Sequence, residues 1–171
     1  MSVLPIRKYG DEVLRRRTEP VTRFDDALQK LIDDMVETMH AAPGIGLAAN
    51  QVGFDLRLAV IDLSVGKRPA GLHVLVNPEI VDREGHVVED EGCLSIPDFT
   101  EGVTRPEKVH VKFLDRNGHP REFTGEGLMA RALAHEIDHL EGKLFIDHLR
   151  GFKRDRIVKK IQKLAKAGMW S

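Results

Sequence analysis

The stretch Leu128-Met129-Ala130-Arg131-Ala132-Leu133-Ala134-His135-Glu136-Ile137-Asp138-His139-Leu140-Glu141 decides the fold. It contains no Gly or Pro, most of its residues favour helices, and Gly142 follows where a helix can end. Its apolar residues recur three and four positions apart, which is the spacing of one helical face. They occupy positions 128, 129, 132, 133, 137 and 140. We therefore expect a helix over 128–141.

Two histidines in this helix have the spacing of metal ligands. His135 and His139 are four residues apart, so their rings share one face and lie about 6 Å apart along the axis. Glu136 points in another direction and would lie beside a metal-bound water, where a carboxylate can accept and return a proton. The ordinary alternative is a helix with two unrelated histidines in the core or on the surface.

Cys93 is the candidate third ligand. A tetrahedral catalytic site uses three protein ligands and leaves one position for water. The cysteine lies in Glu91-Gly92-Cys93-Leu94-Ser95, upstream of the helix, and a metal would hold its sulfur as a thiolate. A lone cysteine is more commonly a small buried apolar residue. By residue type alone, two histidines and a cysteine suit zinc as well as other metals.

A third motif, Gly44-Ile45-Gly46-Leu47-Ala48-Ala49-Asn50-Gln51, follows Pro43. Its small residues would let a substrate backbone come close, and the Gln51 amide could donate to a developing oxyanion. We expect this motif to form a loop with exposed backbone. The alternative is a glycine-rich connection to the preceding helix, without function.

The rest of the chain predicts antiparallel strands and two further helices. Apolar residues at helical spacing indicate a helix over 25–39, capped by Asp25 or Asp26. Another is expected over 152–167, with Ile157 and Ile161 on its apolar face. Asn117-Gly118 predicts a hairpin turn. Strands are expected at 56–63, 73–77, 109–114 and 121–124.

These elements give an α+β fold in which antiparallel β strands pack around a central metal-binding helix, with an N-terminal and a C-terminal helix. The 171 residues are the length of one domain, and no repeat or linker divides them. We expect a single catalytic domain over 1–171, in which 151–171 form a basic C-terminal helix and tail. Positions 150–171 carry eight Lys and Arg against one acid, although the whole chain has a net charge of −1.

Cellular setting follows from the cysteine count and the hydropathy. A single cysteine excludes an intrachain disulfide, and its thiol persists only under reducing conditions, which favours the cytoplasm. No apolar run has the length of a signal peptide or a membrane span, so no membrane association is expected.

In this order, Gly-Ile-Gly-Leu-Ala-Ala-Asn-Gln, Glu-Gly-Cys-Leu-Ser and His-Glu-Ile-Asp-His resemble the three signature segments of peptide deformylases. The resemblance extends from Ile6 to Asp147. It implies removal of the N-formyl group from the initiator methionine of newly made polypeptides, with release of formate. It also implies Fe(II) as the only cofactor, with Zn, Ni or Co as substitutes in purified protein.

The resemblance assigns a role to each matching position. The metal ligands would be Cys93, His135 and His139, with a water or hydroxide that attacks the formyl carbon. Glu136 would be the general base and acid. Gln51 and the Leu94 backbone amide would stabilise the oxyanion. Backbone groups of Ile45 and Gly46 would align the peptide, and Leu128 would form a wall of the methionine pocket.

Other positions extend the resemblance or depart from it. By family position, Asp138 pairs with Arg105 and braces the metal helix from outside the ligand set. Residues 98–101 lack an arginine that some members place there to meet the substrate chain, which puts contacts beyond the first residues in doubt. Arg131 lies where an apolar residue often occurs, and the sequence assigns it no role.

Two other functions compete with deformylation. A zinc peptidase would use the same helix but take its third ligand from downstream, which leaves Asp147 or His148. A non-catalytic, metal-stabilised binding module would use its basic C-terminal helix to dock on nucleic acid or protein. For a deformylase, the same helix could approach the ribosome, where anionic RNA and nascent peptides meet, unless it is only a solvated amphipathic helix.

Overall fold

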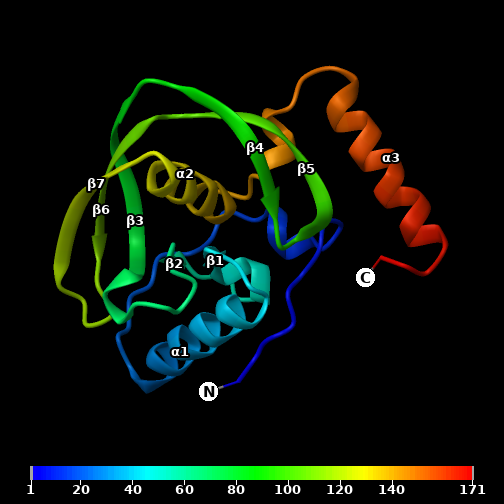
Figure 1. Cartoon of the computed structure of the whole chain (residues 1–171). Helices are drawn as coiled ribbons and strands as arrows, with labels where there is room; N and C mark the ends of the chain where they lie inside the picture. The colour runs from blue at the N-terminus through cyan, green and yellow to red at the C-terminus, as the bar shows by residue number, and fades with distance from the viewer. Residues whose placement is uncertain (1, 171) are drawn as a thin grey trace.

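The computed structural model describes residues 2–170, which form two antiparallel sheets and three α-helices (Figure 1). The larger sheet has five strands in the order β1-β2-β3-β6-β7. The smaller sheet is the hairpin of β4 and β5. The strands are β1 (Gly46–Ala48), β2 (Leu58–Asp62), β3 (Leu72–Glu84), β4 (Val87–Cys93), β5 (Ile96–Arg105), β6 (Lys108–Leu114) and β7 (Pro120–Glu126).

Helix α2 (Leu128–Leu140) lies between the large sheet and the β4–β5 hairpin (Figure 1). Its apolar face packs on side chains that β2, β3 and β6 direct to one side of the sheet, including Ile61, Leu75 and Val109. At Gly125 in β7, an added Cβ would lie 2.7 Å from Met129 Cγ and 2.9 Å from Leu133 Cδ1. The glycine therefore allows α2 to pack closely against β7. His135 and His139 on this helix are buried in the interior.

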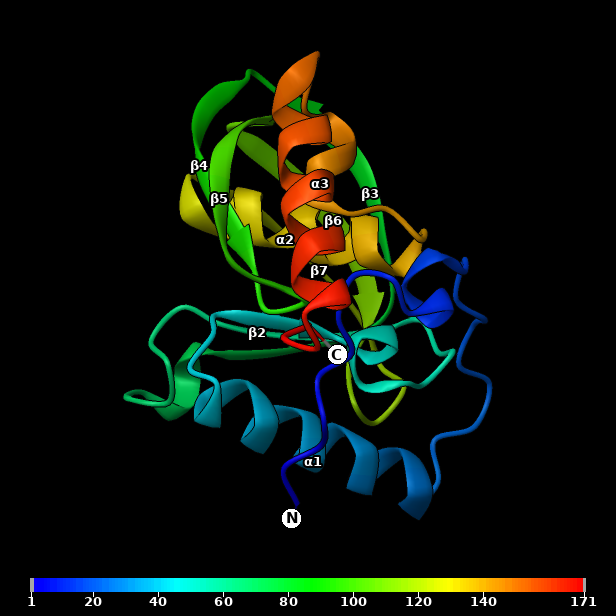
Figure 2. The same cartoon turned by 90° about the vertical axis from the view of Figure 1, so that its right-hand side faces the viewer.

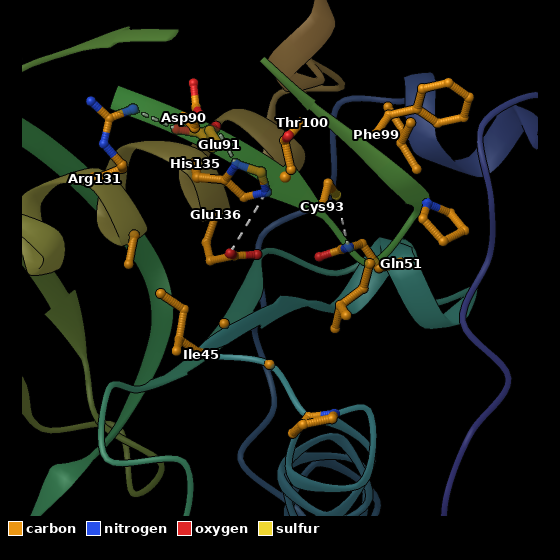
Figure 3. A pocket seen from close by; sticks show the side chains of 18 of the residues that line it. Ile45, Gln51, Asp90, Glu91, Cys93, Phe99, Thr100, Arg131, His135 and Glu136 are labelled. Carbon is orange, nitrogen blue, oxygen red and sulfur yellow. Dashed lines mark hydrogen bonds and ion pairs between the residues drawn. The ribbon is translucent and has the colours of Figure 1, made fainter. Parts of the chain in front are cut away.

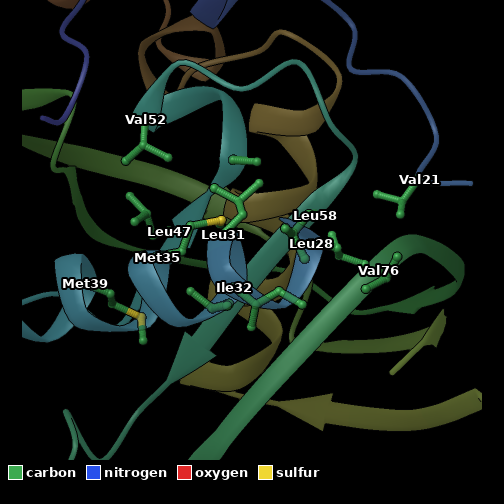
Figure 4. Packing of buried hydrophobic residues seen from close by; sticks show 12 residues of the cluster. Val21, Leu28, Leu31, Ile32, Met35, Met39, Leu47, Val52, Leu58 and Val76 are labelled. Atoms are coloured by element: carbon green, nitrogen blue, oxygen red, sulfur yellow. The ribbon is translucent and has the colours of Figure 1, made fainter. Parts of the chain in front are cut away.

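Helix α1 (Asp26–Ala41) covers the opposite face of the same sheet (Figure 4). Because strand side chains alternate, Leu58 and Val60 of β2 face α1 while Ile61 faces α2. Ile32 and Met35 are fully buried there, and each stabilises the fold by about 1.5–3 kcal/mol relative to an exposed position. Figure 4 shows both side chains among the other residues of this cluster.

Helix α3 (Phe152–Lys166) packs beside β5 rather than extending into solvent (Figures 1 and 2). Ile157 and Ile161 are buried against Ile96 and Val103 of β5 and against the 3-10 helix Phe145–His148. Its lysines lie on the other faces. The basic segment is thus an integral layer of the fold.

The α+β class and the three helices predicted from the sequence are confirmed. The four predicted strands are present, and β3 is longer than expected.

Two expectations were incomplete. Gly46–Ala48 is a strand paired with β2, and Leu47 and Ala48 are fully buried, so the expected exposed loop was wrong there. The β4–β5 hairpin was missed because its strands are rich in charged residues and lack an apolar run.

Among the described residues, no helix combines the length and apolar character needed to cross a bilayer.

Asp62 ends β2 and organises the turn toward β3. Its carboxylate accepts hydrogen bonds from the Ser64 amide and hydroxyl and from the Gly66 amide, and it lies 2.9 Å from His40 Nε2 of α1. Burial alone would raise the pKa of this 1% exposed carboxyl, but the hydrogen bonds from Ser64, His40 and Gly66 outweigh burial and lower the pKa.

We predict that Asp62→Asn lowers the free energy of unfolding by about 1–3 kcal/mol at pH 7, because buried donors lose a charged acceptor. A depressed native pKa stabilises the fold above the unfolded pKa of about 3.9, and this contribution disappears as the pH falls through the native value. The difference between wild type and variant, measured by urea unfolding, should shrink below about pH 4. Exposed Asp82→Asn is the control, and a pH-independent difference would contradict the assignment.

Candidate metal centre

Three ligand atoms converge where β4 ends against α2. Cys93 Sγ lies 3.2 Å from His139 Nε2, which lies 3.1 Å from His135 Nε2. All three ligand atoms are within 4.8 Å of one another, and no other such group occurs within residues 2–170. The histidines are adjacent because α2 places them one turn apart, and the turn between β4 and β5 brings the cysteine to them.

The chemistry of this group fits a bound cation. Two nitrogen or sulfur ligands of one tetrahedral metal, with bonds of about 2.0–2.3 Å, are separated by about 3.3–3.6 Å. The spacings of Cys93 Sγ and His135 Nε2 from His139 Nε2 are only slightly shorter. His135 Nδ1 lies 2.6 Å from a carboxylate oxygen of Glu91, and this contact directs Nε2 toward the centre as the atom that could bind a cation. Cys93, His135 and His139 could therefore hold a metal and leave a fourth position open.

The charges of Cys93 and His135 depend on each other. Burial alone would raise the pKa of the Cys93 thiol, but the imidazoles of His139 and His135 outweigh burial and hold that pKa well below its usual value. Burial would lower the pKa of His135, whereas Glu136, Cys93 and Glu91 raise it well above the ordinary value. A bound cation would take the place of the imidazolium proton as the partner of the thiolate.

Glu91 is the hub of the surrounding hydrogen bonds. Arg105 donates to both of its oxygens, at 3.0 and 2.7 Å, and Arg131 Nη1 donates to Oε1 at 3.0 Å. Burial would raise the pKa of Glu91, but His135 and Arg105 outweigh burial and lower it far below the ordinary range. Arg131 also donates to the carbonyl oxygens of Val87 and Val103, so it ties α2 to both strands of the hairpin.

The predicted pairing of Arg105 with Asp138 is confirmed. Arg105 Nη1 donates to Asp138 Oδ2 at 2.5 Å, and His148 Nε2 lies 2.7 Å from the same oxygen. Arg105 therefore links two acidic residues: Glu91, which contacts His135, and Asp138, which lies on helix α2 with that histidine. The sequence identified this pair but missed Glu91 and Arg131, whose partners lie 14 to 44 residues away along the chain.

Glu136 lies at the inner end of a cavity, beside the ligand atoms (Figure 3). The residue is 4% exposed, its Oε2 lies 4.0 Å from His135 Nε2, and its Oε1 has no hydrogen-bond partner within the described chain. Burial raises the pKa of this carboxyl. An added Cβ at Gly46 would lie 2.5 Å from Oε2, so only glycine lets β1 pass this close to the carboxylate.

Gln51 is oriented toward the centre by its neighbours. Its Oε1 accepts from the Ala48 amide at 2.9 Å, which turns Nε2 toward Ser95 Oγ at 3.1 Å and Cys93 Sγ at 3.6 Å. The adjacent Asn50 donates to the carbonyl oxygen of His139 at 2.6 Å. The motif at 44–51 is therefore attached to the ligand helix through Asn50 and to the cysteine turn through Gln51.

The cavity in front of the centre encloses about 690 Å³. His139, which is 1% exposed, lies behind it. Leu128 is half exposed at the rim, and Arg131 lies in the wall. The predicted site residues that line the cavity are Ile45, Gly46, Gln51, Cys93, Leu94, Leu128, His135 and Glu136.

The residues that a peptidase would need as third ligand are engaged elsewhere. Asp147 forms a salt bridge with Arg15 at 2.6 Å and accepts from the Leu144 amide. His148 pairs with Asp138. Only the upstream cysteine completes the group with the two helix histidines, as judged over residues 2–170.

Comparisons with known proteins agree with this geometry. The sequence profile of the family described as polypeptide deformylase matches residues 3–155. Peptide deformylase of Acidobacterium capsulatum is 51% identical over 170 residues, which cover 99% of this chain and 100% of that protein. That of Mesorhizobium japonicum is 53% identical, over 97% of this chain and 95% of that protein. The crystal structure of a peptide deformylase from Legionella pneumophila has a TM-score of 0.91 and 48% identity, covering 98% of both chains.

Sequence identity, coverage and fold therefore agree, and the chain belongs to the polypeptide deformylase family of metal-dependent hydrolases.

Proposed function

We propose that the protein hydrolyses the N-formyl group from the initiator methionine of newly made polypeptides and releases formate. The observation that carries this proposal is the convergence of Cys93, His135 and His139 beside the buried carboxyl of Glu136, at the inner end of a cavity. A formyl group at the end of a peptide is small enough to reach this point, whereas an internal peptide bond would have to bring chain in from both sides.

Glu136 would move the proton that hydrolysis requires. When bound, the cation would supply Lewis acidity and lower the pKa of water. Glu136 would accept a proton from the attacking water and deliver it to the methionine nitrogen as the C–N bond breaks. Burial supports this role, because it raises the pKa of the carboxyl and so makes the carboxylate a stronger base.

Gln51 and the Leu94 amide would stabilise the negative charge on the formyl oxygen. The Gln51 carboxamide is held by the Ala48 amide, so its Nε2 donor is in place before the reaction. In this structure Nε2 donates to Ser95 Oγ and Cys93 Sγ, and a substrate oxyanion would compete with these two acceptors for the Nε2 donor. Donors fixed in advance stabilise the transition state without a cost of reorganisation.

Backbone groups of Ile45 and Gly46 would align the peptide beside β1, and Leu128 would contact the methionine side chain. Ile45 and Leu128 both line the cavity. An apolar wall of this kind suits an unbranched thioether side chain.

Fe(II) is the proposed resident metal, with Zn, Ni or Co as substitutes in purified protein. One thiolate and two imidazoles form a donor set that suits each of these cations. The unpaired Cys93 thiol supports a reducing, cytoplasmic setting for the enzyme.

The direct test is anaerobic purification followed by metal analysis and a formate-release assay on a formyl-methionyl tripeptide. We predict metal-dependent release of formate. Glu136→Gln should keep the metal and lower kcat by about 10²–10⁴-fold, because the amide cannot accept the proton. Metal-loaded wild type that releases no formate would exclude the proposed activity, and full activity of the variant would exclude the proposed role of Glu136.

Metal retention should depend on Glu91. We predict that Glu91→Gln weakens metal binding by about 10–100-fold, because the neutral side chain no longer fixes the His135 tautomer and leaves Arg105 and Arg131 without their shared anion. Competition with a chelator measures the change. Glu89→Gln, two residues along the same strand with a largely exposed side chain 3.9 Å from Arg131, is the matched control. Equal affinity of both variants would contradict the proposed support.

We also propose that α3 brings the enzyme to the ribosome. Lys153 and Arg156 are occupied by Glu101, but other lysines of the helix are exposed and available to anionic RNA. Exposed Phe152 and Met169 flank this basic surface.

Reversing three exposed charges tests the contact without removing the buried isoleucines of α3. We predict weaker sedimentation with ribosomes at low salt and unchanged formate release from a small peptide, because only the electrostatic attraction is lost. Equal sedimentation of the two triple variants would contradict the proposal. The test variant carries Lys159→Glu, Lys163→Glu and Lys166→Glu, and the control carries Lys67→Glu, Lys112→Glu and Lys143→Glu.

A further inference from the structure

Trp170, four residues after the end of α3, is held by two contacts with the body of the protein. Its indole Nε1 donates to the carbonyl oxygen of Tyr9 at 2.9 Å. Its ring meets Phe99 edge-on, with centroids 6.3 Å apart and planes at 63°. Edge-to-face aromatic pairs of this geometry are attractive beyond the area they bury. The segment is therefore fixed at a defined place beside β5.

Both partners of Trp170 lead to the cavity. Phe99 of β5 lines its outer end, away from Glu136 (Figure 3). The Tyr9 amide donates to the carbonyl oxygen of Ser95 at 2.9 Å, in the turn that follows Cys93. A displacement of Trp170 would thus reach the cavity through a side chain and through a backbone hydrogen bond.

Helix α3 keeps Trp170 in position. Ile157 and Ile161 are buried beside β5, and Glu101, two residues from Phe99, forms salt bridges with Lys153 and Arg156 at 3.6 and 3.5 Å. These exposed ion pairs contribute little by themselves. The buried isoleucines provide the attachment, and the ion pairs lie beside them on the same strand.

The outer end of the cavity can receive only one part of the proposed substrate. The formyl group terminates the chain and must lie at the ligand atoms, near Glu136. The methionine side chain is assigned to the wall at Ile45 and Leu128. The chain beyond methionine is the part that remains to extend past Phe99.

We propose that Trp170 is a positioning residue, which fixes Phe99 and so shapes the outer end of the cavity for the residues that follow the formyl-methionine. This inference rests on the proposed deformylation. Trp170 itself contacts no substrate and acts only through Phe99 and Tyr9. The C-terminal segment would then set affinity for longer peptides without taking part in the chemistry.

The test compares formate release from a formyl-Met-Ala-Ser peptide and from formyl-methionine amide. In Trp170→Ala, KM for the tripeptide should rise about two- to tenfold with kcat unchanged, as expected for the loss of one aromatic contact. KM for the amide should stay the same. Trp170→Phe keeps a ring against Phe99 and should restore most of the affinity, whereas Met169→Ala, at an exposed neighbour, should match wild type.

A second measurement needs no turnover. Trp170 is the single tryptophan, so the intrinsic fluorescence of the protein reports on this contact. Titration of the product peptide Met-Ala-Ser should shift the emission of wild type, and Phe99→Ala should abolish the shift. This result would support the proposal even if Trp170→Ala does not fold.

Three results would overturn the inference: an unchanged tripeptide KM in Trp170→Ala, an equal change for both substrates, or no fluorescence response to the product peptide. Failure of the wild-type protein to release formate from either substrate would instead overturn the proposed function. The two failures are therefore distinguishable.

Discussion

The buried carboxylate of Glu91 is the interaction on which the rest of the site depends. It accepts from Arg105 and Arg131 and meets His135 Nδ1, so a single anion joins β4, β5 and α2. Withdrawing so many charges from water is expensive, and the arrangement is stable only because nearly every lone pair and donor is matched. Removing one member would leave an uncompensated charge in the interior. His135 is therefore oriented by a hydrogen-bond network whose members depend on one another.

This network explains how a polar hairpin can belong to the interior of the enzyme. Strands β4 and β5 contribute few large apolar side chains, and Val88 is largely exposed. The hairpin is attached instead by Arg131, which bonds to Val87 and Val103, and by α3 on its outer side. Directional hydrogen bonds fix the position of the β4–β5 hairpin relative to α2. Cys93, at the end of β4, needs this fixed position to contact His135 and His139.

Local patterns predicted what is encoded locally. The helical period and the four-residue spacing predicted α2 and its histidines, and the Asn117-Gly118 turn predicted the β6–β7 hairpin. Residue type made Cys93 a candidate ligand beside the common alternative of a buried apolar residue, and the resemblance favoured the ligand role and added the Arg105–Asp138 pair. The missed features depend on partners far apart in sequence. Nothing near Glu91 indicates Arg131, 40 residues away. The apolar face of α3 was predicted, but the surface that buries Ile157 and Ile161 was not, because other segments form it. Charge-rich strands β4 and β5 lack the apolar alternation by which strands are recognised.

The centre also holds polar atoms that the rest of the fold leaves unpaired. Glu136 Oε1 and His139 Nδ1 are both buried without a hydrogen-bond partner within residues 2–170. An unpaired buried polar atom destabilises a fold by about 1–3 kcal/mol, so such atoms persist where function requires them or where a further ligand completes them. For Glu136 the reason lies in the proposed proton transfer, since a carboxylate saturated by protein donors would have a low pKa and little capacity to accept a proton. Glu91 and Glu136 are thus two buried carboxyls with opposite environments: donors surround the one that must stay charged and orient a ligand, and they are absent from the oxygen that must remain free to react.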